Sequence, residues 1–118
     1  MSDDDRYLKI RARVMRDGEI ALGPGKVDLL EHIDRCGSIS AAARAMGMSY
    51  RRAWLLVDAM NRNFRAPLVA SSPGGSGGGG AHITDEGRTL IAHYRALQVA
   101  LRKASEHHAG PLLEALKD

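Results

Sequence analysis

The chain has 118 residues, a formal net charge of +3 and only 4% aromatic residues. This length suits one small domain with a modest core, which self-association would help to stabilise. No apolar run approaches the roughly 20 residues that a membrane helix needs, and the acidic start MSDDDR is unlike a signal peptide. We therefore expect a cytoplasmic protein without membrane contact. The single cysteine, Cys36, excludes an intrachain disulfide and ends an apolar helix face, which predicts a buried thiol.

The N-terminal residues 1–23 are expected to form a strand and a hairpin. Apolar and charged side chains alternate over residues 7–14, a pattern typical of a half-buried strand. The dipeptide Asp17-Gly18 is a turn signal, after which residues 19–22 can pair back. The remainder of the chain is expected to divide into residues 24–87 and residues 88–118.

Residues 26–36 are predicted to form the first helix, which Gly37 ends. Its apolar side chains and its acidic side chains each recur at helical spacing, so one side should be buried and the other solvated. The predicted buried stripe consists of Val27, Leu29, Leu30 and Ile33. The acids expected to face solvent are Asp28, Glu31 and Asp34.

A short helix over residues 41–46, a turn at Gly47 and a long helix after Ser49 have the spacing of a helix-turn-helix. Ser38 or Ser40 can cap the short helix, and Ser49 can cap the long one. The long helix is expected to run to about residue 64. Its predicted core face consists of Ala53, Val57, Met60 and Phe64.

Basic residues concentrate on these two helices, with five arginines and one acid, Asp58, between residues 44 and 65. The first turn of the second helix of a helix-turn-helix reaches base edges in the major groove. Arginine can donate two hydrogen bonds to guanine, and serine or tyrosine can reach phosphate. Trp54 is assigned to the core or to an interface. The predicted DNA-binding residues here are Ser40, Ser49, Tyr50, Arg51, Arg52, Leu55 and Arg62.

A glycine loop, PGGSGGGGAHIT, occupies residues 73–84, between short strand-like runs at residues 68–71 and 81–84. It lacks the Gly-Lys-Ser/Thr sequence of a P-loop. One interpretation is a flexible linker. The other, which we favour, is a wing whose backbone N–H groups lie against a phosphate. The predicted wing contacts are Gly75, Ser76, Gly77, Gly78 and His82.

Thr84 can cap a last helix that runs to residue 107 or 108, before Gly110-Pro111 breaks the chain. Its apolar stripe is longer than a small winged helix needs to cover its core, and soluble monomers rarely tolerate such an exposed patch. We therefore predict a dimerisation helix; the alternative is that the stripe packs on the first helix of the same chain. The stripe consists of Leu90, Tyr94, Leu97 and Leu101.

Catalysis and metal binding find no support in the sequence. It has no Ser-His-Asp signature, no pair of carboxylates in a buried setting and no nucleotide-binding fingerprint. The five histidines are scattered, and one cysteine accompanies them. We therefore expect no metal, no cofactor and no enzyme activity.

The segments GSISAAARAMGMSYRRAWLLVDAMN, PLV and GGSGGGGAHIT resemble the DNA-binding domain of the ModE molybdate-responsive transcription regulators, a winged helix-turn-helix related to that of LysR-type regulators. The resemblance covers about residues 9–101. It implies a homodimer, paired through the N-terminal hairpin and the last helix, that grips double-stranded DNA at a pseudo-palindromic operator. Ser76 stands where the family often has a basic residue. The family's oxyanion-binding domains have no counterpart before Asp118, so we expect no molybdate binding by this chain alone.

The expected fold is mainly α with small β elements, a winged helix-turn-helix with a long C-terminal dimerisation helix. The expected function is sequence-specific DNA binding in transcription regulation. The alternative is a protein-interaction module, such as a heterodimer partner of a full-length regulator without DNA binding of its own. Such a module would not need the arginine cluster at Arg51, Arg52, Arg62 and Arg65.

Overall fold

The computed structural model describes residues 5–73 and 79–118. Within these residues the chain is mainly helical, with two small antiparallel sheets, so the predicted fold class is confirmed. None of the helices in this part of the chain is both long and apolar enough to cross a membrane. The elements are β1 (Val14–Arg16), β2 (Glu19–Leu22), α1 (Pro24–Cys36), α2 (Ile39–Ala45), α3 (Tyr50–Asn63), β3 (Val69–Ser72), β4 (Gly80–Ile83) and α4 (Asp85–Glu114).

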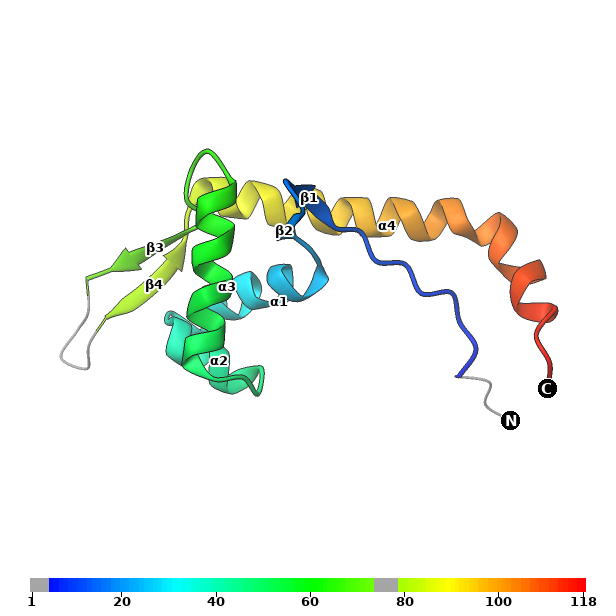
Figure 1. Cartoon of the computed structure of the whole chain (residues 1–118), viewed down its shortest axis with the longest axis horizontal. Helices are drawn as coiled ribbons and strands as arrows, with labels where there is room; N and C mark the ends of the chain where they lie inside the picture. Colours follow the sequence, from blue (N-terminus) through cyan, green and yellow to red (C-terminus); the bar gives the residue numbers. More distant parts are fainter. Residues whose placement is uncertain (1–4, 74–78) are drawn as a thin grey trace.

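The core lies where α1, α2, α3 and the start of α4 meet (Figure 1). α3 stands across α1 and α2, and α4 passes over α1 and continues well beyond it. The predicted stripe of α1 is buried, as are Ala53, Val57 and Met60 on α3, while Phe64 is partly buried. The largest fully buried side chains are Leu29, Leu30, Ile33, Met60, Leu68 and Val27.

α1 begins two residues earlier than predicted, at Pro24. Proline fits the first turn of a helix because the N–H that it lacks would have no partner there. The helix ends as predicted: Gly37 adopts the left-handed conformation, with φ of 77°, and its N–H bonds to the carbonyl of Ile33 at 2.9 Å. That conformation is readily adopted by glycine and disfavoured for other residues.

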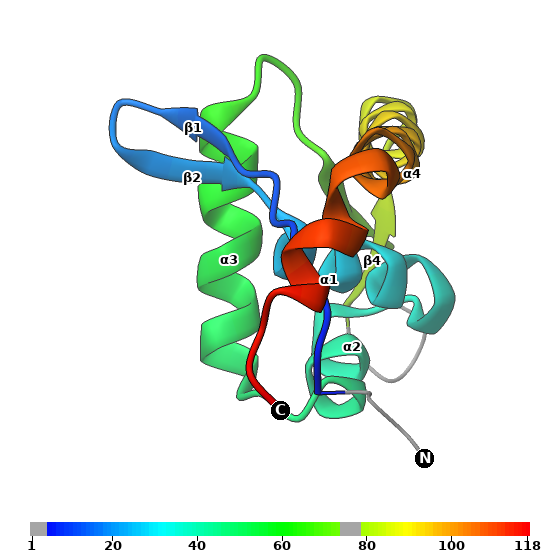
Figure 2. The ribbon, with the colours of Figure 1, turned by 90° about the vertical axis from the view of Figure 1, so that its right-hand side faces the viewer.

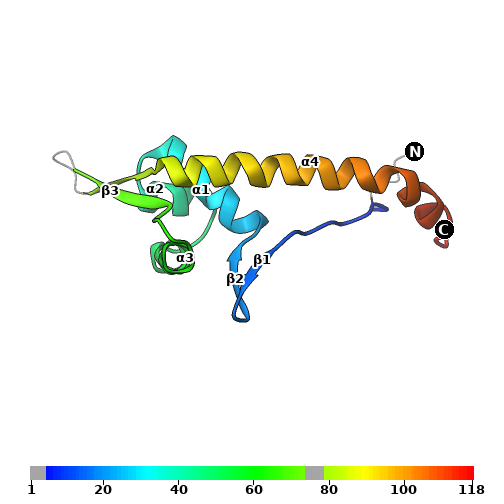
Figure 3. The same cartoon turned by 90° about the horizontal axis from the view of Figure 1, so that it is seen from above.

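β3 and β4 form the predicted hairpin, with Val69 opposite Ile83 and Ser72 opposite Gly80. Figure 3 shows this hairpin extending away from the helices at one end of the molecule. The predicted contacts at its tip, Gly75, Ser76, Gly77 and Gly78, lie outside the described residues.

The N-terminal hairpin is confirmed, but the strand predicted over residues 7–14 is not. β1 and β2 pair as expected across Asp17-Gly18, both of which have positive φ (Figure 2). Residues 6–13 lie outside any sheet and form an arm, with Leu8 and Ile10 each 42% exposed. The alternating pattern was a poor guide because no neighbouring strand in the described part of the chain pairs with this segment.

α4 does not stop before Gly110-Pro111, as predicted, but continues to Glu114 with Pro111 inside it. It bends in its last turns (Figure 1). A proline removes one backbone hydrogen bond and kinks a helix without necessarily ending it. The exposed position of Gly110 and Pro111 leaves solvent free to bond the carbonyl that loses its partner.

The apolar stripe predicted on α4 divides in two. Tyr94 is buried, and its hydroxyl donates a 2.7 Å hydrogen bond to the carbonyl of Ala12, while Leu90 packs against the core. Burial raises the pKa of Tyr94, so its hydroxyl stays protonated as a donor. Leu97 is 42% exposed, and Leu101 is half-buried. The first half of the stripe therefore packs within its own chain, which was the alternative to dimerisation.

Two further expectations about α1 are wrong. Cys36 is exposed, because it is the last residue of the helix and the chain turns away at Gly37. The three acids of α1 do not simply face solvent: Asp28 and Glu31 pair with Arg95, and Asp34 pairs with Arg88. Helical spacing placed them on one face but could not show that α4 crosses that face.

Candidate nucleic-acid interface

The helix-turn-helix is built by local hydrogen bonds that the sequence predicted. The Ser38 hydroxyl caps α2 by accepting from the N–H of Ala41 at 3.0 Å, and the Ser49 hydroxyl caps α3 by accepting from the N–H of Arg52 at 3.1 Å. Gly47 makes the turn between them with φ of 69°. The Ser49 hydroxyl, predicted to contact DNA, is therefore already engaged in capping.

The outer face of α3 is exposed and carries several large side chains. Tyr50 is 55% exposed, and Trp54 and Leu55 are each 46% exposed. Arg51 and Arg52 are also exposed, and neither forms an ion pair within residues 5–73 and 79–118. Of the two places predicted for Trp54, the core is excluded by its exposure, and an interface stays a prediction.

Arg62, another predicted contact, is engaged at the far end of α3. Its guanidinium lies 3.1 Å from Asp58 and 3.6 Å from Glu19. The hydrogen bond that it donates to Asp58 is the main cause that raises the pKa of Arg62, and the hydrogen bond donated by Asn63 is the main cause that lowers the pKa of Glu19. Because two carboxylates share its charge, Arg62 is a weaker candidate for a phosphate contact than Arg51 or Arg52.

Asn61 joins α3 to the wing, and sequence reasoning missed it. Its side-chain oxygen accepts from the N–H of Leu68 at 2.8 Å and from that of Val69 at 3.3 Å, and its amide donates to the carbonyl of Val69 at 3.0 Å. These bonds fix the start of β3 against the helix. The signal in the sequence was a polar residue next to the core face of α3, shortly before a strand.

The wing is held at a second point by the turn before α2. The N–H of Ala81 bonds to the carbonyl of Gly37 at 2.9 Å. A Cβ on Gly80 would lie 3.0 Å from the same carbonyl oxygen, so a glycine allows β4 this close approach. These hydrogen bonds tie β3 to α3 and β4 to the turn before α2.

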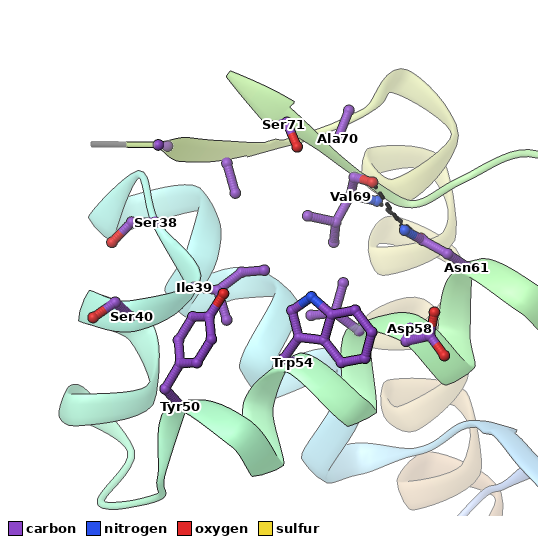
Figure 4. A pocket seen from close by; sticks show the side chains of 14 residues that line it. Ser38, Ile39, Ser40, Tyr50, Trp54, Asp58, Asn61, Val69, Ala70 and Ser71 are labelled. Carbon is purple, nitrogen blue, oxygen red and sulfur yellow. Dashed lines mark hydrogen bonds between the residues drawn. The ribbon is translucent and has the colours of Figure 1, made fainter. Parts of the chain in front are cut away.

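A groove of about 390 Å³ lies between α3 and the wing (Figure 4). Tyr50 and Trp54 project into it from α3, Ser38 and Ser40 edge it from α2, and Ser71 edges it from β3. The Trp54 indole stands near its centre. The side of α3 that faces the groove is thus aromatic and is bordered by hydroxyl groups. Arg51 and Arg52 do not line this groove and lie on the solvent-exposed face of α3.

The remaining predicted contacts occupy different places. Ser40 is exposed and accepts from Arg44 at 3.3 Å. His82 is exposed on β4, where its ring lies 2.8 Å from the hydroxyl of Ser72, and it does not line the groove. Across the described residues, no group of three His, Cys, Asp or Glu side chains is placed to hold a metal ion.

Residues 25–88 match the family described as "Bacterial regulatory helix-turn-helix protein, lysR family". This match spans more than half of the chain. The chain belongs to this family. The matched residues run from the start of α1 through both helices of the helix-turn-helix and the wing to the first turn of α4.

Individual members of the family show a closer likeness. The chain is 50% identical over 101 residues to the "Molybdenum-pterin-binding protein MopB" of Rhodobacter capsulatus, covering 86% of this chain and 37% of that protein. It is 42% identical to the "Molybdenum transport protein ModE" of Azotobacter vinelandii, covering 79% and 35%. It is 38% identical to the "DNA-binding transcriptional dual regulator ModE" of Escherichia coli, covering 82% and 35%. The predicted resemblance to ModE regulators is confirmed, and the chain spans about a third of the length of these relatives.

Proposed function

We propose that this chain is a DNA-binding module of ModE type that recognises a double-stranded operator in transcription regulation, in the cytoplasm. The observation that carries the proposal is the outer face of α3, where Arg51 and Arg52 are exposed without an ion pair among the described residues. The family match and the relative named as a DNA-binding regulator support it.

The arrangement gives each part of α3 a role on DNA. Inserted into the major groove, α3 presents Arg51 at the centre of its exposed face, where a bidentate hydrogen bond to guanine is feasible. Leu55 lies one turn further along and can contact a thymine methyl. Arg52 lies toward the flank and is placed for a phosphate. The wing, fixed to α3 by Asn61, would follow the adjacent backbone.

Selection from a random library of double-stranded DNA tests this proposal. We expect enrichment of one sequence and tight binding to it in fluorescence anisotropy, with little loss in the presence of unrelated competitor DNA. Trp54 is the only tryptophan and stands beside the proposed interface, so its emission should change on binding. Failure to enrich any sequence would favour the interaction-module alternative.

We also propose that the chain forms a homodimer through α4 and the N-terminal arm. A groove of about 620 Å³ lies between these two segments; the arm lines it mostly with apolar side chains, and α4 lines it with a mixture of apolar and polar ones. The exposed apolar side chains Leu97, Val99 and Leu112 of a second copy of α4 can pack against this region, giving a two-fold interface with the same patch on both sides. The exposed apolar residues of this region include Tyr7, Leu8, Ile10, Leu97, Val99 and Leu112.

Light scattering at micromolar concentration separates monomer from dimer. We expect twice the chain mass for the native protein and a single-chain mass for Leu97→Asp or Val99→Asp, with weaker binding to a two-half-site operator. Thr89→Asp is the matched control, since Thr89 is an exposed position of α4 before the groove begins. A native monomer, or a Leu97→Asp variant with unchanged mass and DNA affinity, would contradict the dimer.

The present 118 residues are not proposed to bind molybdate. The matched stretch makes up 37% of the relative named as a molybdenum-pterin-binding protein, which leaves most of that protein outside the match. Calorimetry with molybdate and tungstate on this chain is the direct test. Stoichiometric binding would contradict the proposal.

A further inference from the structure

Arg95 forms the most extensive side-chain contact between α4 and the DNA-binding unit. Its guanidinium bonds both oxygens of Glu31, at 2.5 Å and 3.1 Å, and one oxygen of Asp28 at 2.8 Å. The fourth bond is to the side-chain oxygen of Gln98, at 2.7 Å. We call Arg95, Asp28, Glu31 and Gln98 the Arg95 clasp. These four bonds use four of the five N–H donors of the guanidinium, which gives the contact a defined direction as well as charge.

The clasp lies between the two surfaces proposed above. Asp28 and Glu31 belong to α1, which packs against the helix-turn-helix, while Arg95 and Gln98 line the groove proposed to receive the partner's α4. Arg88 and Asp34 make a second two-bond contact between the same helices, at 2.9 Å and 3.2 Å, nearer the start of α4. The two contacts together resist rotation of α4 against α1.

Beyond the clasp, α4 is a projecting arm of the molecule. The chain extends 57 Å along its longest axis, which α4 follows (Figure 1). At the usual rise per residue, residues 96–114 cover about 28 Å, so a tilt of about 10° at the clasp would move the far end by about 5 Å. A small change in the helix angle at Arg95 therefore produces a large displacement at the far part of the proposed dimer contact.

We infer that the Arg95 clasp sets the spacing between the two recognition helices of the dimer, and so the half-site spacing of the operator. This inference rests on the proposed function. The proposed dimer contact lies on α4 and the proposed DNA contact lies on α3. The angle between α4 and α1 at the clasp therefore sets how the two contacts are oriented relative to each other. One added base pair shifts a half-site by about 3.4 Å and turns it by roughly 35°, so a defined angle selects one spacing. Arg95 is thus a positioning residue and touches no DNA.

The first test measures, without DNA, the distance between the two DNA-binding units of the dimer. A nitroxide label on Cys36, the only cysteine and an exposed residue at the end of α1, reports the distance between the two DNA-binding units of a dimer by pulsed electron resonance. We expect a narrow distance distribution for the native chain and a shifted or broadened one for Arg95→Met. Lys103→Met is the control, since Lys103 is an exposed cation of the same helix that neither lines the proposed dimer groove nor forms an ion pair with the described residues. An unchanged distribution in Arg95→Met would overturn the inference, and so would a labelled chain that stays monomeric.

The second test measures specificity. Operators with half-sites moved apart or together by one and two base pairs are titrated with native chain, Arg95→Met, Arg95→Lys and Glu31→Gln. We expect the preference for the best spacing to fall by about fivefold in Arg95→Met, the scale of one partly exposed ion pair, and by less in the two conservative variants. Affinity for a single half-site should not change. Because Arg95 lines the groove proposed for the partner's α4, the spacing profiles are compared at concentrations where light scattering shows each variant as a dimer.

Two results would contradict this second prediction. An equal loss of affinity at every half-site spacing would show that Arg95 has only a structural role. An unchanged dependence of affinity on spacing would show that Arg95 does not set the angle between α4 and α1. Absence of any binding by the native chain would instead refute the proposed function, which the distance measurement on Cys36 does not require.

Discussion

The two ends of this molecule both expose large apolar side chains, but the surroundings of those side chains differ. On α3 they are Tyr50, Trp54 and Leu55, beside the exposed Arg51 and Arg52. At the other end they extend along the arm, β1 and α4. There the arginines that lie closest to the DNA-binding unit, Arg88 and Arg95, are each held by acids of α1.

The difference indicates what each surface is suited to contact. Free cations beside aromatic and aliphatic side chains suit a polyanion whose bases offer apolar edges, because charge gives affinity and the side chains give discrimination. A groove that combines apolar side chains with charged residues such as Arg6, Arg102 and Glu106 suits a second protein surface, where an apolar centre is bordered by a polar rim. Exposure alone does not separate the two surfaces. The ion pairs of Arg88 and Arg95, which tie α4 to α1, have no counterpart at Arg51 and Arg52 within the described residues.

The substitution with the largest expected effect lies where the wing meets the start of α4, between the two ends of the molecule. A Cβ on Gly87 would lie 2.5 Å from the carbonyl oxygen of Leu68, which also accepts from the N–H of Thr84 at 3.0 Å. Gly87→Ala should therefore destabilise the fold by about 1–3 kcal/mol or more. Thermal unfolding measures this as a fall of several degrees in Tm.

Gly25→Ala is the matched control for that experiment. Gly25 is an exposed residue of α1, and a Cβ at this position would meet no other segment of the described chain within 4 Å. Alanine there should stabilise the fold by about 0.5–1 kcal/mol, because glycine is the more flexible residue in the unfolded chain. Equal effects of the two substitutions would show that the close approach at Gly87 does not hold wing and α4 together.

On the DNA-facing end, Arg51 and Arg62 should differ. Arg51→Ala is expected to cost about 1–3 kcal/mol of specific binding and to relax the preference at one base, if its contact is bidentate to guanine. Arg62→Ala should cost less, because Asp58 and Glu19 already share the charge of Arg62. Anisotropy with the selected operator and its single-base variants gives both numbers. A larger effect from Arg62 would reverse the ranking.

At the clasp, stability should depend on acidity. The hydrogen bond from Arg95 holds the pKa of Glu31 below its ordinary value of 4.5. A carboxyl whose pKa is lower in the folded state stabilises the fold above its unfolded pKa, and this contribution is lost as pH falls through the folded value. We expect Arg95→Met to lose less stability than the native chain between about pH 5 and pH 3. The measurement is the free energy of unfolding of the two proteins at several pH values across that range. Free energies that fall in parallel would contradict this effect, which is the smallest that we predict.

Much of the DNA-facing end could be predicted from local sequence. The caps at Ser38 and Ser49, the turn at Gly47 and the end of α1 at Gly37 all depend on residues within a few positions of each other. The wing hairpin could be placed because strand-like runs flank its glycines. The contact roles assigned to individual side chains of this end stay predictions.

Several of the errors concern contacts that local sequence does not show. The acids of α1 pair with arginines more than 50 positions away, and Asn61 holds a strand that is only apparent once the chain folds back. Pro111 was expected to end α4, but a proline's effect depends on its surroundings. Periodicity shows which residues share a face and leaves open what crosses that face.

The salt dependence of DNA binding tests the central claim most directly. Each phosphate contact through an arginine should steepen the fall of log K with log salt by about 0.9. We predict a steep slope for the native chain, reduced by about one unit in Arg52→Ala and unchanged in Lys103→Ala, an exposed position of α4 outside the proposed dimer groove. Binding with no salt dependence, or none at low salt to any duplex, would contradict the assignment of α3 as a DNA-recognition helix.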